Sequence, residues 1–91
     1  MDFNESPAEA AFRTEAKSWL AANAPQHQIP EGVMLDDTEE VVRGRVWQRA
    51  LYDGGYAGIT VSKTLGGRGG TGIEAVIFAE EEARYNLPKG P

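Results

Sequence analysis

The sequence predicts an all-α protein, a small helical domain of about three main helices joined by a proline-containing loop and a glycine-rich loop. Three observations predict it. Helix-start signals recur at Ser6, Asp37 and Thr71, each followed three residues later by a glutamate that can bond back to the capping residue. Apolar residues after these signals return at spacings of three and four. Most glycines lie between Gly54 and Gly72, so they interrupt the helices at one place.

The first helix is expected to begin after Ser6, because proline at position 7 suits the first helical turn. It ends near Asn23, since Pro25 cannot continue the hydrogen-bond ladder. One apolar stripe runs along it: Ala8, Phe12, Ala16, Trp19 and Leu20. Residues 24–36 form a connection that is expected to pack down through its apolar residues Ile29, Val33, Met34 and Leu35. His27 in this connection is interpreted as a solvated side chain, because no carboxylate or nucleophile stands beside it in sequence.

The second helix is expected to begin at Asp37, with Glu40 three residues later, and to stop at Gly54-Gly55. Its predicted apolar face is Val42, Val46, Trp47, Ala50 and Leu51. Arg43, Arg45 and Arg49 form a basic face. A solvated face paired with nearby acids, such as Arg49 with Asp53 one turn later, is favoured over a phosphate site.

Residues 56–61 combine aromatic and β-branched residues, which predicts a short extended piece. The third helix is expected to begin at Thr71 and to be ended by Pro88 and Pro91. It is apolar around much of its early circumference, and the run Glu80-Glu81-Glu82 indicates that its far end meets solvent.

Composition excludes several functions. The net charge of −5 argues against nucleic acid, and with a single histidine and no cysteine a zinc site is implausible. The absence of cysteine fits a reducing compartment. The apolar runs are too short to span a membrane, and the N-terminus lacks a signal pattern, so we expect a cytoplasmic protein. No catalytic or metal-binding residue is predicted.

The stretch "GRGGTG" from Gly67 to Gly72 fits the dinucleotide fingerprint G-x-G-x-x-G literally. That fingerprint needs a buried strand leading straight into the first glycine, and the strand candidate ends near Val61. No Gly-Lys-Ser/Thr follows, so a Walker A loop fails as well. A helix–helix connection is the favoured interpretation; an independent nucleotide binder using Gly67, Gly69 and Gly72 remains the alternative.

Three stretches together resemble the helical N-terminal domain of acyl-CoA dehydrogenases: "FRTEAKSWLAANAP" at 12–25, "VVRGRVWQRALYDGGYAGIT" at 41–60 and "LGGRGGTGIEAVIFAEEEAR" at 65–84. The most specific piece runs from Trp47 to Ile59. One departure is the lead-in "VSKTL" at 61–65, where the family commonly has an aromatic-Pro-x-acid-aromatic pattern. The resemblance covers nearly the whole chain and makes residues 1–91 one domain, with the family's middle β-domain and C-terminal helical bundle absent.

The resemblance implies an FAD-dependent oxidoreductase that, when complete, oxidises an acyl-CoA to the 2-enoyl-CoA. It implies an acyl-CoA substrate, an electron-transfer acceptor and a homo- or hetero-oligomer. Flavin contacts and catalytic base lie chiefly in the later domains of such enzymes, so the chain alone is expected to be inactive and to bind no FAD, and its cofactor-binding residues stay unknown. The chain is interpreted as a piece of a longer enzyme. The alternative is a short, non-catalytic accessory module that docks onto a larger subunit.

Overall fold

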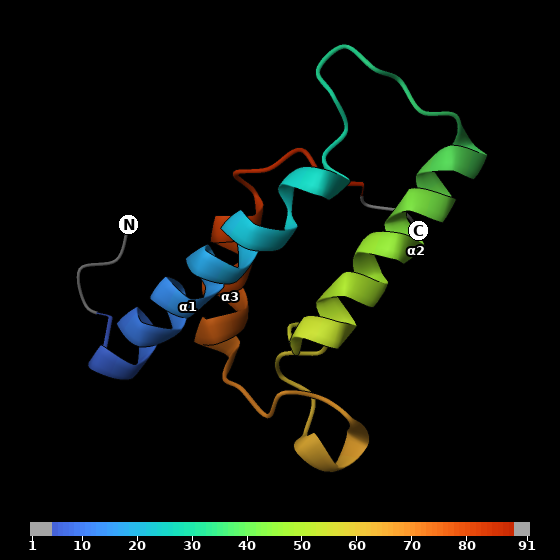
Figure 1. Ribbon diagram of the computed structural model, residues 1–91. Coiled ribbons are helices and arrows are strands. Elements are labelled where there is room, and N and C mark those ends of the chain that lie inside the picture. The colour runs from blue at the N-terminus through green and yellow to red at the C-terminus, as the bar shows by residue number, and fades with distance from the viewer. Residues whose placement is uncertain (1–4, 89–91) are drawn as a thin grey trace.

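The computed structural model describes residues 5–88, in which all regular secondary structure is helical and no strand is present. The main helices are α1 (Pro7–Asn23), α2 (Asp37–Gly54) and α3 (Gly72–Glu82). Two short 3₁₀ helices, η1 (Pro25–His27) and η2 (Lys63–Leu65), stand in the connections. In Figure 1, α1 and α3 lie side by side, and α2 is set apart from them. The predicted all-α class is confirmed.

Each main helix starts with a reciprocal capping box. In α1 the Glu9 N–H donates to Ser6 Oγ at 3.1 Å, and the Ser6 N–H donates to Glu9 Oε1 at 2.9 Å. Thr71 and Glu74 repeat the arrangement at α3, as predicted.

The cap of α2 is one residue earlier than predicted. Asp36 accepts the N–H of Glu39 at 2.8 Å, and Asp37 is already helical. The sequence holds two overlapping boxes, Asp36 with Glu39 and Asp37 with Glu40, so the spacing rule does not separate them. The extended backbone at Asp36, with φ −74° and ψ 171°, decides the register.

An aromatic cluster forms the core where α1, α3 and the C-terminal half of α2 meet. The Trp19 ring lies 4.9 Å from Tyr56 and 5.7 Å from Trp47, and Tyr56 stacks on Phe78 at 4.8 Å. The approach of α1 to the end of α2 requires a glycine, because a Cβ at Gly54 would lie 2.5 Å from the Trp19 ring. The buried apolar residues are Phe12, Ala16, Leu20, Ala24, Trp47, Leu51, Tyr56, Ile59, Ile77, Phe78 and Leu87.

The extended piece predicted at residues 56–61 is wrong, because the chain makes consecutive turns there. Gly55 and Gly58 take positive φ angles of 86° and 62°, which glycine adopts without strain. The Tyr56 and Ala57 N–H groups both donate to the Leu51 carbonyl, which closes the end of α2. Tyr56 and Ile59 are nevertheless buried, so their apolar character serves the core rather than a strand.

Several predicted apolar faces are only partly covered. Val42 and Val46 on α2 are exposed, since only the C-terminal half of that helix reaches the core. In the connection 24–36, Met34 is 92% exposed and Val33 is exposed as well, so packing through these two was wrongly predicted. The helix α3 ends at Glu82 rather than near Pro88, and a turn follows in which the Tyr85 N–H donates to the Glu82 carbonyl. Pro91, the other predicted stop, lies outside the described residues.

Candidate functional site

The glycine-rich loop is the candidate nucleotide site of the sequence, and from Gly67 to Thr71 its backbone N–H groups are engaged in hydrogen bonds within the protein. The N–H groups of Gly67, Arg68, Gly69 and Gly70 donate to the carbonyls of Ser62, Gly58, Val61 and Ile59 at 2.6–3.2 Å. Beyond them, the Thr71 N–H donates to the carboxylate of Glu74. A dinucleotide cradle needs such N–H groups aimed at a pyrophosphate, and it does not place a carboxylate at the helix start. The geometry therefore fits a folded connection and does not fit the phosphates of FAD or NAD.

Close packing explains two of these glycines. A Cβ at Gly67 would lie 2.2 Å from the Val61 carbonyl oxygen, and one at Gly70 would lie 3.1 Å from the Ile59 carbonyl oxygen and 2.5 Å from a Glu74 side-chain oxygen. The loop thus folds back onto residues 58–62. Glycine is required here for the approach of two backbone segments, as the connection hypothesis predicts.

Arg68 fixes this loop to the core. Its guanidinium carbon lies 4.6 Å from the centre of the Tyr56 ring and 5.1 Å from that of Phe12. The same group donates to Glu15 on α1 at 2.5 Å and to the Gly55 carbonyl at 3.1 Å. One side chain therefore ties together the loop, α1 and the end of α2 through charge, hydrogen bonding and cation–π contact.

Glu15 also accepts a hydrogen bond from the Tyr56 hydroxyl. This bond lowers the pKa of Glu15 and outweighs the opposing effect of partial burial, and the Arg68 bond acts in the same downward direction. Burial, and then the bond to Glu15, raises the pKa of Tyr56 to about 12. Both shifts keep Glu15 charged and Tyr56 protonated at neutral pH, which is the state in which Tyr56 donates and Glu15 accepts this hydrogen bond.

A second charged cluster joins α1 to α3. Arg13 donates to Glu5 and Glu81 at 2.6 Å and to Glu80 at 2.8 Å, and these bonds, led by that to Glu5, raise the pKa of Arg13 above its usual value. Glu81 is only 6% exposed, and its other oxygen is 3.5 Å from Arg84. The prediction that the run 80–82 meets solvent is therefore wrong for Glu81, because Arg13 and Arg84 compensate its burial.

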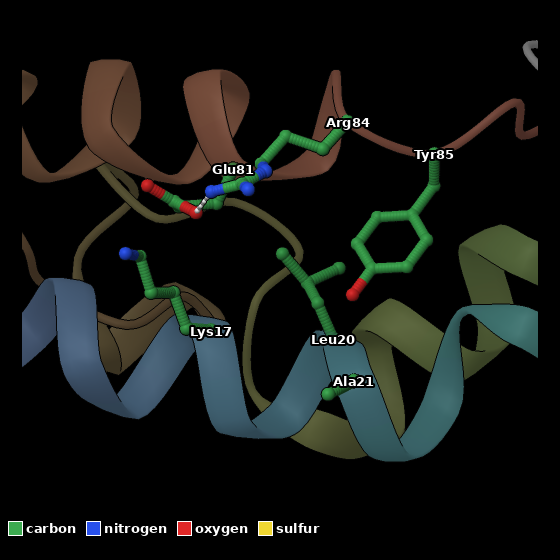
Figure 2. A pocket seen from close by; sticks show the side chains of 6 residues that line it. All are labelled: Lys17, Leu20, Ala21, Glu81, Arg84 and Tyr85. Atoms are coloured by element: carbon green, nitrogen blue, oxygen red, sulfur yellow. Dashed lines mark ion pairs between the residues drawn. The ribbon is translucent and has the colours of Figure 1, made fainter.

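A hollow of about 460 Å³ lies between α1 and the end of α3. Figure 2 shows Lys17 and Leu20 on α1 facing Glu81, Arg84 and Tyr85 across it, and Ala21 completes the lining from α1. Its polar end contains the Glu81–Arg84 ion pair, which belongs to the charged cluster around Arg13, and Lys17 adds a further charge from α1. These residues serve helix packing, and no reacting group is assigned to them.

The remaining residues that the sequence singled out are the three arginines of α2 and His27. Arg49 pairs with Asp53 at 3.1 Å, as predicted, and all three arginines of the basic face are exposed. His27 is half-buried rather than free in solvent, with its ring 5.2 Å from that of Trp47. Sequence reasoning missed Arg13 and Arg68, whose partners lie 53 to 68 residues away for the most part. No short-range sequence pattern predicts such pairs.

Among residues 5–88, no helix combines the length and apolar character needed to cross a membrane. The same stretch holds no group of three or more histidine, cysteine, aspartate or glutamate side chains placed to bind a metal ion.

Comparison with curated proteins and with solved structures gave no match. A comparison with protein families did: the model of the acyl-CoA dehydrogenase N-terminal domain matches residues 6–90. The match includes all three capping boxes, the aromatic cluster and the glycine loop described above. The helical architecture of residues 5–88, with the glycine loop as a packed connection before α3, agrees with it. The chain therefore belongs to the acyl-CoA dehydrogenase family, of which it is an N-terminal domain.

Proposed function

We propose that this chain is the N-terminal helical domain of an FAD-dependent acyl-CoA dehydrogenase, which in its complete form oxidises an acyl-CoA to the 2-enoyl-CoA. The observation that carries the proposal is the family match over residues 6–90. In such enzymes the flavin supplies the hydride acceptor, and an acceptor protein or small molecule then removes the electrons. The glycine loop does not fit the flavin phosphates, so no flavin contact is assigned to these residues.

The contribution proposed for this domain is structural. Its charged clusters hold α1, α3 and the glycine loop in one arrangement, while apolar residues remain uncovered on two helices: Val42 on α2, and Ile73 and Val76 on α3. A helix that is apolar on most sides is usually buried in a larger protein. These exposed apolar faces support a role in which the domain docks onto the remaining domains of the enzyme, in an oligomer.

The first experiment is the intact mass of the product of the native reading frame, compared with the 9.9 kDa of this chain. A product several times larger is expected. A product of 9.9 kDa would contradict the enzyme proposal and favour the accessory module, and the next step would be to identify the subunit that it binds.

The second experiment tests the activity on that complete product. Purified protein is expected to carry FAD, and adding an acyl-CoA without oxygen is expected to bleach the flavin. Saturated and already unsaturated acyl-CoA of one chain length form the matched pair, because only the first can be oxidised at the α and β carbons. A complete protein that binds no flavin, or whose flavin no acyl-CoA reduces, would refute the proposal.

A further inference from the structure

A smaller hollow of about 280 Å³ lies where η1 meets the middle of α2. Its lining combines three hydrogen-bond donors, Gln26, His27 and Arg43, with the apolar Val46 and Pro88. These residues are distant in sequence, and the fold brings them to one place. The lining contains no carboxylate, whereas the hollows beside α1, Ile29 and Met34 each include a glutamate.

The residues behind these donors are held in place by packing and hydrogen bonds. The His27 ring rests against Trp47, whose side chain is 2% exposed and whose indole N–H donates to Glu82 at 2.8 Å. The backbone N–H of His27 donates to the Ala24 carbonyl at 2.9 Å, which holds η1 in place. Within residues 5–88, no hydrogen bond or ion pair engages the side chains of Gln26, His27 or Arg43. Gln26 and Arg43 are exposed and His27 is half-buried, so all three donors line one hollow that is open to a ligand from solvent.

We propose that this hollow binds the oxyanion group of a small molecule, a phosphate or a carboxylate, between Arg43 and His27. A guanidinium offers paired donors that match such a group, and an imidazole N–H and the Gln26 amide supply further donors. Val46 and Pro88 would contact the apolar body that carries the anion. This site is independent of the dehydrogenase proposal, because it uses none of the chemistry of that reaction.

The test follows backbone amide shifts of the chain by NMR while inorganic phosphate is added, with sodium chloride adjusted to hold ionic strength constant. A parallel titration with acetate distinguishes the two sources of the oxyanion. Saturable shifts are expected at residues 26–28 and 42–47. Tighter binding of phosphate would identify a phosphate ligand, and equal or tighter binding of acetate would identify a carboxylate.

Arg43→Gln is expected to weaken binding by about five-fold, the size of one solvent-exposed charged contact. Arg45→Gln is the matched control, since Arg45 is exposed on the same helix and does not line the hollow. His27→Ala tests the second donor. Shifts that scatter over the surface, fail to saturate or weaken equally in the two arginine variants would refute the site, because they indicate screening by the net charge rather than binding.

Discussion

Gly67 is required by close packing rather than by its own backbone angle, because its φ is not positive while an added Cβ would lie 2.2 Å from the Val61 carbonyl oxygen. Gly67→Ala is expected to lower the free energy of unfolding by about 2 kcal/mol, since two backbone segments would have to separate. Gly72→Ala is the matched control. That position has nothing within 4 Å, and alanine in a helix is expected to stabilise by up to about 1 kcal/mol. Urea unfolding measures both variants, and equal losses would contradict the packing argument.

The hydrogen bond between Glu15 and Tyr56 predicts a pH dependence on the acid side. The pKa of Glu15 in the folded protein lies below its ordinary 4.5, so its stabilising effect is present above pH 4.5 and is lost as pH falls through the lowered value. Glu15 is half exposed, which limits the effect to about 1 kcal/mol. Glu15→Gln is expected to flatten the acid side of the stability profile in thermal unfolding, whereas Glu31→Gln, an exposed residue in a loop, leaves it unchanged. An unaltered slope in Glu15→Gln would contradict the assignment.

At the scale of the element, the two overlapping capping boxes of α2 provide a direct test of register. Asp36→Ala is expected to cost about 1 kcal/mol, because it leaves the Glu39 N–H without its side-chain acceptor. Asp37→Ala is expected to cost only a few tenths of a kcal/mol, through the helix dipole alone. Chemical denaturation of both variants decides between the registers. A larger loss of stability for Asp37→Ala than for Asp36→Ala would show that Asp37 is the N-cap, as the sequence analysis predicts.

Helix existence was predictable because its causes are local. Ser6 and Thr71 cap their helices through partners three residues away, and Gly55 ends α2 through its own positive φ. The extended interpretation of residues 56–61 failed because the Gly55 and Gly58 turns override side-chain propensity. The charged clusters around Arg13 and Arg68 were not predictable in the same way, since their partners come together only through the packing of α1 against α3 and the loop.

At the scale of the whole molecule, the described residues form a flat body of 41 × 31 × 19 Å rather than a sphere. Periodicity placed Val42 and Val46 on the same helix face as Trp47, but it could not show that α2 is set apart from α1 and α3, which leaves these two residues exposed. Sequence pattern therefore indicated which residues are apolar, while the arrangement of the helices determined which of them are covered.

The exposed residues Ile73 and Val76 lie one turn apart on α3, with exposed fractions of 54% and 58%. Apolar faces of this kind promote association when no partner covers them, so the isolated chain is expected to self-associate as concentration rises. Ile73→Gln with Val76→Gln should reduce the association while changing stability by less than about 0.5 kcal/mol per site, because both side chains are largely in solvent. Ser18→Gln with Ala22→Gln, exposed on α1, is the matched control and should leave it unchanged.

Sedimentation velocity over a range of concentrations measures the association of all three proteins. In a complete acyl-CoA dehydrogenase this face of α3 is proposed to be covered by other segments. The α3 double variant should then lower the stability of the whole enzyme. A face that stayed in solvent would leave that stability unchanged. A parent chain that remains monomeric, or an α3 variant that associates as strongly as the parent, would show that this face drives no contact. The two results together distinguish a docking surface from apolar residues that are merely exposed.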